Sequence, residues 1–369
     1  MKNRLLPVLR VMGMLLGFFS FTYLLPIVAS LIYADGVRDK FMAAMACSFL
    51  AGLVLWWPNR RCRRELQPRD GFLLVTMAWL LMAAIATVPL MLAIPGLSFT
   101  DAFFETMSGL TTTGATVLTG LEQLPPSVNL WRHTLNWFGG MGIIVLAVAI
   151  LPLLGVGGMQ LFKAETPGPM KDSKLTPRIA GTAKALWLVY FGITVACICA
   201  LKLVGMNWLD AVCHAFAALS LGGFSTYDAS VGHFDSPAIE AVLIIFMLLA
   251  GMNFATHFLA LRGRSLRSYW ADAEAKAFIV LIVASILVCA TFLWGVGTYS
   301  SWLTALRHVA FNLVSIATDC GFVSLDYDQW PIFVPMWMLF LSCFVACSGS
   351  TGGGIKFDSR THSYPAVAA

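Results

Sequence analysis

The stretch 109-GLTTTGATVL-118 places three threonines and a glycine between two apolar segments and contains no charged residue. Two later stretches, 218-ALSLGGFSTY-227 and 316-IATDCGFVSL-325, interrupt the chain in the same way. Of the 369 residues, 59% are hydrophobic and 12% are charged, whereas about a quarter of a soluble domain is charged. The composition therefore indicates a polytopic membrane protein, within which the three polar stretches must be accommodated.

Long apolar segments recur along the chain, as expected of helices that cross a bilayer. The predicted spans are 11–33, 41–57, 72–95, 135–156, 185–206, 238–261, 277–297 and 332–347. Nineteen of the 24 Lys and Arg residues then lie in loops on one side, and the positive-inside rule places that side and the N-terminus in the cytoplasm. This division requires the segments 101–118, 210–227 and 304–325 to enter the membrane and return to the outer side.

The three polar stretches belong to an internal repeat, which appears when Gly114, Gly223 and Gly321 are aligned. The repeat separations are 109 and 98 residues. A polar residue stands nine positions before each glycine: Glu105, His214 and Asn312. A hydroxyl residue stands three positions before it: Thr111, Ser220 and Thr318. Another glycine stands 28 positions after it: Gly142, Gly251 and Gly349. Each unit therefore reads as a spanning helix, a short helix, a polar extended segment and a second spanning helix.

The polar segment of each repeat predicts an ion path. Non-helical backbone is tolerated at membrane depth only where it lines water or is buried in protein. A ring of such segments presents backbone carbonyls that replace the hydration shell of a cation. We expect the aligned glycines to adopt conformations that a Cβ disfavours. Asp101 and Asp210 are predicted to be N-cap residues of the short helices.

Further motifs carry a resemblance to a known family. Together with the polar stretches, 137-WFGGMGIIV-145, 250-AGMNFATHF-258 and 347-CSGSTGGGIK-356 resemble the Trk/Ktr/HKT superfamily of potassium transporters. Two spans ahead of the first repeat are similar to the bacterial TrkH branch. The resemblance implies potassium uptake through a pseudo-fourfold pore in the bacterial inner membrane. It also implies a homodimer, cytoplasmic TrkA-type nucleotide-binding subunits, no enzymatic activity and no cofactor, with K⁺ as the transported ion.

The resemblance implies three selectivity-filter segments that bind potassium. Their residues are Thr111, Thr112, Thr113 and Gly114; Ser220, Leu221, Gly222 and Gly223; and Thr318, Asp319, Cys320 and Gly321. Leu221 and Asp319 are unusual for an ion path, and they fit best if backbone carbonyls face the ion. Acidic residues beyond the filters either concentrate cations or belong to a solvated loop; these are Glu122, Asp228, Asp235, Asp326 and Asp328.

The glycine-rich run is predicted to break the last span. It is not a phosphate-binding loop, because Ile355 separates Lys356 from the glycines and no strand precedes it. Each glycine in a helix costs about 1 kcal/mol relative to alanine, so the run does not support a helix. In the resembling family this segment is an intramembrane gate, here Gly349, Ser350, Thr351, Gly352, Gly353 and Gly354.

The predicted organisation is all-α, with three of the family's four helix–pore-helix–filter–helix units after two extra N-terminal spans. The predicted units are 1–68 (N-terminal helices), 69–165, 166–268 and 269–356 (repeats 1 to 3) and 357–369 (an atypical tail). The tail contains no apolar run, so we expect a C-terminally truncated form that does not conduct potassium by itself. Such a form should be unstable in the membrane or depend on another chain.

Two other functions are compatible with these features. One is a non-conducting remnant or a regulatory membrane partner of full-length relatives. The other is a secondary solute transporter, which would also contain broken helices but is built from inverted repeats. The three repeats here all begin on the predicted cytoplasmic side, which disfavours the transporter.

Overall fold

The computed structural model describes residues 2–62, 64, 68–142, 179–344, 347 and 350–353, and within these ranges the regular structure is helical. Five helical segments are long and apolar enough to cross a membrane, and a sixth would count if one bent pair is a single span. The predicted all-α polytopic membrane architecture is confirmed. Residues 143–178 and the tail 357–369 lie outside the described residues, so the domain boundaries drawn through them stay predictions.

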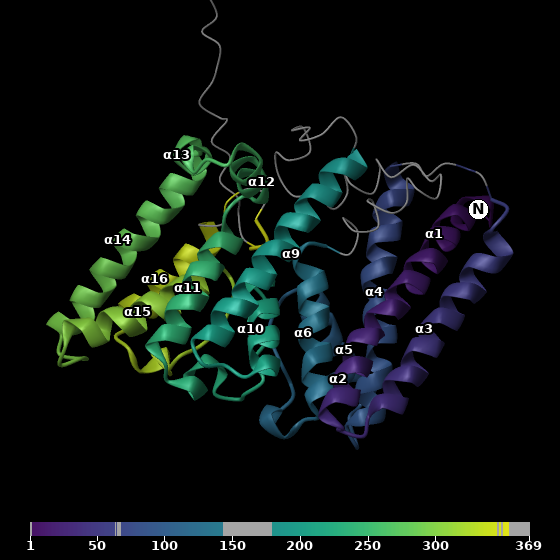
Figure 1. The fold of residues 1–369 in the computed structure, drawn as a ribbon, viewed down its shortest axis with the longest axis horizontal. Helices are drawn as coiled ribbons and strands as arrows, with labels where there is room; N and C mark the ends of the chain where they lie inside the picture. Colours follow the sequence, from purple (N-terminus) through teal and green to yellow (C-terminus); the bar gives the residue numbers. More distant parts are fainter. Residues whose placement is uncertain are drawn as a thin grey trace, which may run out of the picture.

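The N-terminal helices form a hairpin at one end of the molecule (Figure 1). Helix α1 (Lys2–Ser20) continues through a short 3-10 turn, Phe21–Tyr23, into α2 (Leu24–Tyr33), and α3 (Arg38–Asn59) returns alongside α1. Asp35 in the turn accepts hydrogen bonds from the backbone N and Oγ of Ser127, at 3.0 and 2.6 Å. Burial opposes ionisation of Asp35, but these bonds and one from Ser30 outweigh it and lower the pKa of the carboxyl. The turn is thereby fixed to the first repeat.

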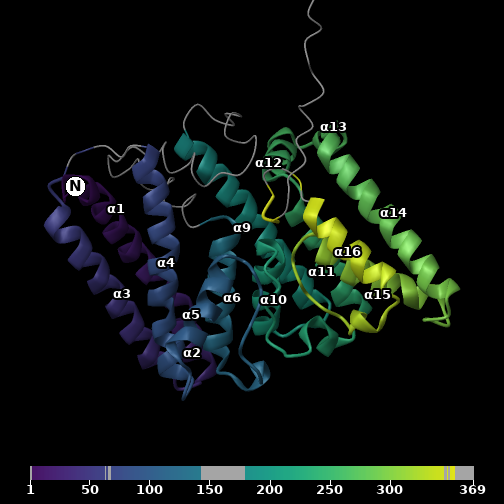
Figure 2. The same cartoon turned by 180° about the vertical axis from the view of Figure 1, so that it is seen from behind.

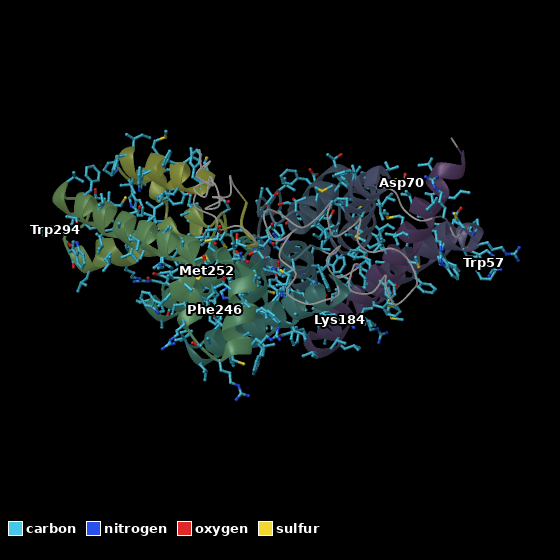
Figure 3. The ribbon with its side chains drawn as sticks, turned by 90° about the horizontal axis from the view of Figure 1, so that it is seen from above. Trp57, Asp70, Lys184, Phe246, Met252 and Trp294 are labelled. Carbon is cyan, nitrogen blue, oxygen red and sulfur yellow. The ribbon has the colours of Figure 1, made fainter. Side chains whose placement is uncertain are left out.

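Three repeated units follow one another across the molecule (Figures 1 and 2). Repeat 1 contains α4 (Pro68–Ala93), α5 (Phe99–Leu110) and α6 (Pro126–Gly140). Repeat 2 contains α9 (Ile179–Leu203), α10 (Trp208–Ser220) and α11 (Pro237–Gly251), and repeat 3 contains α14 (Ala273–Gly295), α15 (Trp302–Ala317) and α16 (Phe333–Phe344). Seen from above, the row runs from Trp57 of the N-terminal hairpin to Trp294 at the opposite end (Figure 3).

The second helix of each repeat is too short to cross the bilayer. Helices α5, α10 and α15 have 12, 13 and 16 residues, which is about 18–24 Å of helix against a hydrocarbon core of about 30 Å. Each is followed by a polar extended segment, so the re-entrant arrangement predicted for these regions is present.

The N-cap prediction was wrong by three residues. Ser98 and Asn207 cap α5 and α10, and their side chains accept hydrogen bonds from the backbone N–H of Asp101 and Asp210. The two aspartates lie in the first turn instead, where their negative charge favours the positive end of the helix dipole. A side-chain oxygen three residues ahead of an acidic residue reproduces the capping-box spacing, which the sequence reading overlooked.

The predicted uninterrupted span 238–261 is also wrong. Helix α11 ends at Gly251, α12 (Phe254–Gly263) begins after Asn253, and the two helices are bent by 98°. Met252 is extended, with ψ 164°, and the Asn253 side chain accepts a hydrogen bond from Ala255 N at 2.9 Å. A short 3-10 element, Ser230–Phe234, precedes α11, and α13 (Arg267–Ala271) links α12 to α14; the other 3-10 elements are Leu121–Gln123 and Tyr327–Gln329.

The caps provide a test of what holds the short helices in place. Replacing Ser98 or Asn207 by Ala removes a capping bond worth about 1 kcal/mol, so we expect a lower midpoint of thermal unfolding for either purified variant. Ser301 caps α15 without a side-chain hydrogen bond, so Ser301→Ala is the matched control and should leave the midpoint almost unchanged. An equal loss in all three variants would contradict the assigned caps.

Candidate functional site

The three predicted filter segments, 111–114, 220–223 and 318–321, share one backbone conformation. Gly114, Gly223 and Gly321 have φ values of 75°, 64° and 87°, which confirms the conformation expected of the aligned glycines. Two residues before them, Thr112, Leu221 and Asp319 also have positive φ, at 53°, 53° and 62°. The sequence did not reveal these positive φ values. A left-handed conformation costs a non-glycine residue about 1–2 kcal/mol, and Thr, Leu and Asp share no common preference for it. Three independent occurrences at one position indicate a conformation that the repeat requires.

Each filter segment is fixed to the helix before it by an equivalent backbone bond. The N–H groups of Thr113, Gly222 and Cys320 donate to carbonyls five residues back, at 2.9, 2.9 and 2.8 Å; the acceptors are Ser108, Ala217 and Ser315. These bonds satisfy carbonyls that the end of a helix would otherwise leave unpaired. The short helices therefore direct their C-terminal ends at the filter segments.

A second equivalent contact fixes the chain after each glycine. The polar residues nine positions before the glycines do this with different chemistry. Glu105 accepts from Thr116 Oγ1 at 2.9 Å and from Val117 N at 3.3 Å. His214 Nε2 lies 3.0 Å from Ser225 Oγ.

The third member of this set is Asn312. It accepts from Ser324 N at 3.1 Å and donates to Ser324 Oγ at 2.8 Å. The sequence showed that the three positions are polar, and the structure shows that each holds the outgoing segment of its own repeat. We call Glu105, His214 and Asn312 the clamp residues.

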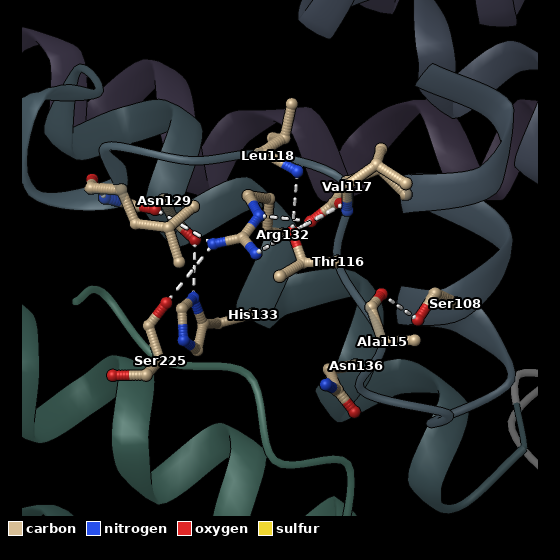
Figure 4. A network of polar contacts seen from close by, with 12 residues as sticks. Ser108, Ala115, Thr116, Val117, Leu118, Asn129, Arg132, His133, Asn136 and Ser225 are labelled. Carbon is tan, nitrogen blue, oxygen red and sulfur yellow. Dashed lines mark hydrogen bonds and ion pairs between the residues drawn. The ribbon is translucent and has the colours of Figure 1, made fainter. Parts of the chain in front are cut away.

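In repeat 1 the clamp residue is part of a buried ionic network, drawn in Figure 4. Arg132 of α6 is 1% exposed and donates through Nε to Glu105 Oε1 at 2.7 Å. Its Nη1 donates to Asn129 Oδ1 at 3.1 Å and to the Ser225 carbonyl, in repeat 2, at 3.2 Å. The guanidinium also lies 4.5 Å from the centre of the Phe224 ring. Arg132 thus joins the first two repeats directly behind their filter segments.

Neighbouring filter segments are in backbone contact. A Cβ added at Gly114 would lie 2.2 Å from the Gly222 carbonyl oxygen, and one added at Gly223 would lie 2.0 Å from the Cys320 carbonyl oxygen. A Cβ at Gly321 would meet no atom of the described residues within 4 Å. Gly114 of repeat 1 therefore contacts the backbone of repeat 2, and Gly223 of repeat 2 contacts the backbone of repeat 3 in the same way.

The acidic residues beyond the filters take part in structural contacts. Asp228 of repeat 2 accepts from the backbone N–H groups of Gly120 and Leu121 in repeat 1, at 2.7 and 3.0 Å. Asp235 pairs with Arg307 at 2.8 Å. Asp210, in the first turn of α10, also bonds to the chain that follows its filter segment, since it accepts from Tyr227 Oη at 2.9 Å. Burial, and then this bond, raise the pKa of Tyr227 to about 12. These bonds favour a structural role for Asp228 and Asp235.

A cavity of about 580 Å³ brings part of the predicted site together. It is lined by Thr111, Thr112, Thr113, Leu221, Asp319 and Gly321 of the filter segments, by Thr351 and Gly353 of the gate, and by Ile316, Ser342 and Cys343. The other predicted filter residues do not line it; these are Gly114, Ser220, Gly222, Gly223, Thr318 and Cys320. Ser220 and Gly222 instead bond to the Asn136 side chain, which sequence reasoning missed.

The described part of the predicted gate is non-helical, as expected. Ser350 and Thr351 lie in a bend, and Gly352 and Gly353 have no regular structure, whereas Gly349 and Gly354 lie outside the described residues. Thr351 Oγ1 lies 3.1 Å from the Leu219 carbonyl and 3.3 Å from the Ala250 carbonyl. The gate segment is therefore held against the last turns of α10 and α11.

The fold and the site define an integral membrane protein with repeated re-entrant segments that converge on a cavity. A model of the family described as "TrkH: Cation transport protein" matches residues 37–361, and the chain belongs to this family. It is 49% identical over 348 residues to the Trk system potassium uptake protein TrkH of Salmonella typhimurium, covering 94% of this chain and 72% of that protein. The TrkG protein of Escherichia coli is 38% identical, with coverage of 93% and 71%.

A solved structure gives the same result. The crystal structure of the potassium transporter TrkH from Vibrio parahaemolyticus is similar with a TM-score of 0.84 and 44% sequence identity. The similarity covers 96% of this chain and 73% of that one. These relatives are transport proteins rather than enzymes.

The buried ionic network predicts a large loss of stability when its carboxylate is removed. Glu105→Ala leaves the Arg132 charge buried without its partner, which costs about 3–5 kcal/mol, so we expect much less folded protein in the membrane. Glu240→Ala is the matched control, since Arg307 is 27% exposed and keeps its bond to Asp235. Fluorescence-detected size-exclusion chromatography would measure both variants, and equal yields would contradict this role of Glu105.

Proposed function

We propose that this chain transports potassium across the bacterial inner membrane through the three filter segments, as its relatives' names indicate for them. The observation that carries the proposal is the common backbone of the segments, with positive φ at the aligned glycine and again two residues earlier. A conformation that recurs in three segments, with three unrelated side chains at Thr112, Leu221 and Asp319, points to a function of the backbone rather than of the side chains.

The proposed mechanism is dehydration of K⁺ by backbone carbonyls, supported by threonine hydroxyls of segment 111–114. Carbonyl oxygens at the filter replace the water that the ion loses. The C-terminal ends of α5, α10 and α15 point at the segments, and the negative end of each helix dipole favours a cation there. We assign the gate to residues 349–354, of which Thr351 and Gly353 line the cavity. Passage is down the electrochemical gradient.

The direction of the repeats supports this mechanism over a secondary transporter. Helices α4, α9 and α14 all begin at the end of the molecule where the N-terminus lies (Figure 1). Secondary transporters of the inverted-repeat type have halves that run in opposite directions. The excess of basic residues in loops at that end supports a cytoplasmic N-terminus. Homodimerisation and control by TrkA-type subunits are proposed from membership of the family.

The filter assignment predicts a preference for potassium that depends on Gly223. We expect KCl to raise the thermal unfolding midpoint of the purified chain more than NaCl does, because only the bound ion stabilises the folded state. Gly223→Ser places a Cβ on the Cys320 carbonyl at a φ of 64° and should abolish the difference. Gly297→Ser is the matched control, because Gly297 has φ 78° but open space around it.

A KCl preference that persists in Gly223→Ser would contradict the filter assignment. If Gly223→Ser and Gly297→Ser both lost the KCl preference, the loss would be explained by strain at a positive-φ residue anywhere in the chain, and not by the filter. Selective loss in Gly223→Ser alone is the outcome that supports the proposal.

The gate assignment predicts higher flux when the Thr351 hydroxyl is removed. Thr351→Val keeps the shape of the side chain but loses the bonds to the Leu219 and Ala250 carbonyls, together worth about 1–2 kcal/mol. We expect roughly tenfold more rubidium uptake when the variant is joined to the fourth repeat of a full-length relative and expressed in cells that lack their own potassium uptake systems. Thr76→Val is the control, because Thr76 bonds to its own helix on an exposed face. Unchanged uptake at equal expression would contradict the gate.

A further inference from the structure

An apolar groove lies on the outer face of the N-terminal hairpin, far from the filter segments. It has a volume of about 340 Å³, within the range of small-molecule sites, and opens between α1 and α3. Its lining residues are Gly13, Met14, Gly17, Phe18, Phe21, Phe49, Gly52, Leu53 and Trp56. Phe18, Phe21 and Phe49 are 42%, 58% and 48% exposed, so the walls of the groove stand out from the hairpin surface.

Glycines create the floor of this groove. A Cβ on Gly13 would lie 2.6 Å from the Gly52 carbonyl oxygen, so the two helix backbones are in contact there. A Cβ on Gly17 would meet nothing within 4 Å, because Gly17 faces the empty part of the groove. The groove thus runs between two helices that are long and apolar enough to cross a membrane, and its apolar lining suits an acyl chain.

Basic groups stand at one end of the groove. Arg10 is one helical turn before Gly13, and Arg60 is one turn after Trp56, so both lie beyond the same end. Arg10 Nη1 donates to the Cys62 carbonyl at 2.6 Å, which places Arg10 beside the end of α3. Its Nε is buried and has no hydrogen-bond acceptor among the described residues.

The end with the arginines lies where lipid headgroups are expected. Arg60 stacks on Trp57 at 4.0 Å from the ring centre, and Trp57 projects from the edge of the molecule (Figure 3). Tryptophan and basic residues mark the membrane–water interface. Arg60 and Arg61 are exposed. The positive charge at this end complements an anionic headgroup, while the groove complements the chain attached to it.

We propose that the α1–α3 groove binds an anionic phospholipid. One acyl chain lies along Gly17 between the phenylalanines, and the phosphate and headgroup lie against Arg10 and Arg60. Anionic lipids are enriched at the cytoplasmic surface, where each nearby basic residue attracts them. None of the residues that line the groove belongs to the filter segments, so the lipid proposal does not depend on the proposed potassium path.

Native mass spectrometry of the purified chain tests this proposal with an equimolar mixture of phosphatidylglycerol and phosphatidylcholine that carry the same oleoyl chains. We expect phosphatidylglycerol to be retained in roughly tenfold preference. Arg60→Gln should reduce the preference severalfold without loss of folded protein, since Arg60 lies at the surface. Gly17→Leu, which the open space accommodates, should reduce retention of both lipids.

Matched controls separate the groove from general lipid contact. Arg38→Gln removes an exposed arginine at the opposite end of α3, and Gly295→Leu adds an apolar side chain at an open helix end. Neither should change retention. Equal retention of the two lipids by the wild-type chain, or unchanged retention by Gly17→Leu, would overturn the proposal. If Gly17→Leu lowered the fraction of dimer and left lipid retention unchanged, the groove would instead hold a second copy of the chain, and the lipid proposal would be overturned.

Discussion

The fold depends on satisfying the backbone groups of three non-helical segments at membrane depth. In hydrocarbon each unpaired peptide group costs several kcal/mol, so extended chain survives there only when protein surrounds it. In every described repeat a helix carbonyl accepts the N–H just before the aligned glycine. The clamp residue accepts a backbone N–H just after the glycine in repeats 1 and 3, and it bonds the Ser225 side chain in repeat 2. The short helices α5, α10 and α15 carry both the carbonyl acceptors and the clamp residues that make these bonds.

Repetition of the geometry did not require repetition of the chemistry. Glu105, His214 and Asn312 occupy one structural position and all present a hydrogen-bonding group to the outgoing chain. The glutamate alone brings a charge, and the buried Arg132 balances it while reaching the Ser225 carbonyl of the next repeat. A buried ion pair adds little net stability, since desolvation offsets its attraction. Its effect here is to fix the relative position of two repeats, because neither charge can move without losing its partner.

The sequence predicted those positions of the repeat at which the backbone or a contact requires one kind of residue. Glycine at φ near 75° and a polar residue nine positions earlier can be read from the chain, because other residue types fit those places poorly. The break between α11 and α12 was not readable, since 238–261 is long and mostly apolar, and its few polar residues did not stand out as a boundary. The Asn253 cap and the close packing of Gly251 mark the break in the structure. Leu221 at φ 53° was equally hidden, because a leucine does not favour that conformation. It ends α10 there, beside the bond from Gly222 N to the Ala217 carbonyl.

The proposed gate and the proposed filter segments share their supports. Thr351 bonds to the Leu219 carbonyl, which immediately precedes segment 220–223, and to the Ala250 carbonyl at the break after α11. Asp319 and Gly353 both line the cavity and are neighbours, since a Cβ on Gly353 would lie 3.1 Å from Asp319 Oδ2. A displacement of residues 350–353 therefore changes contacts at the base of two different filter segments. Packed interfaces tend to have discrete alternative arrangements rather than a continuous range. If residues 350–353 act as the proposed gate, their movement and a change in the geometry of the proposed filter segments are expected to be coupled through Leu219, Ala250 and Asp319, and not through the clamp residues.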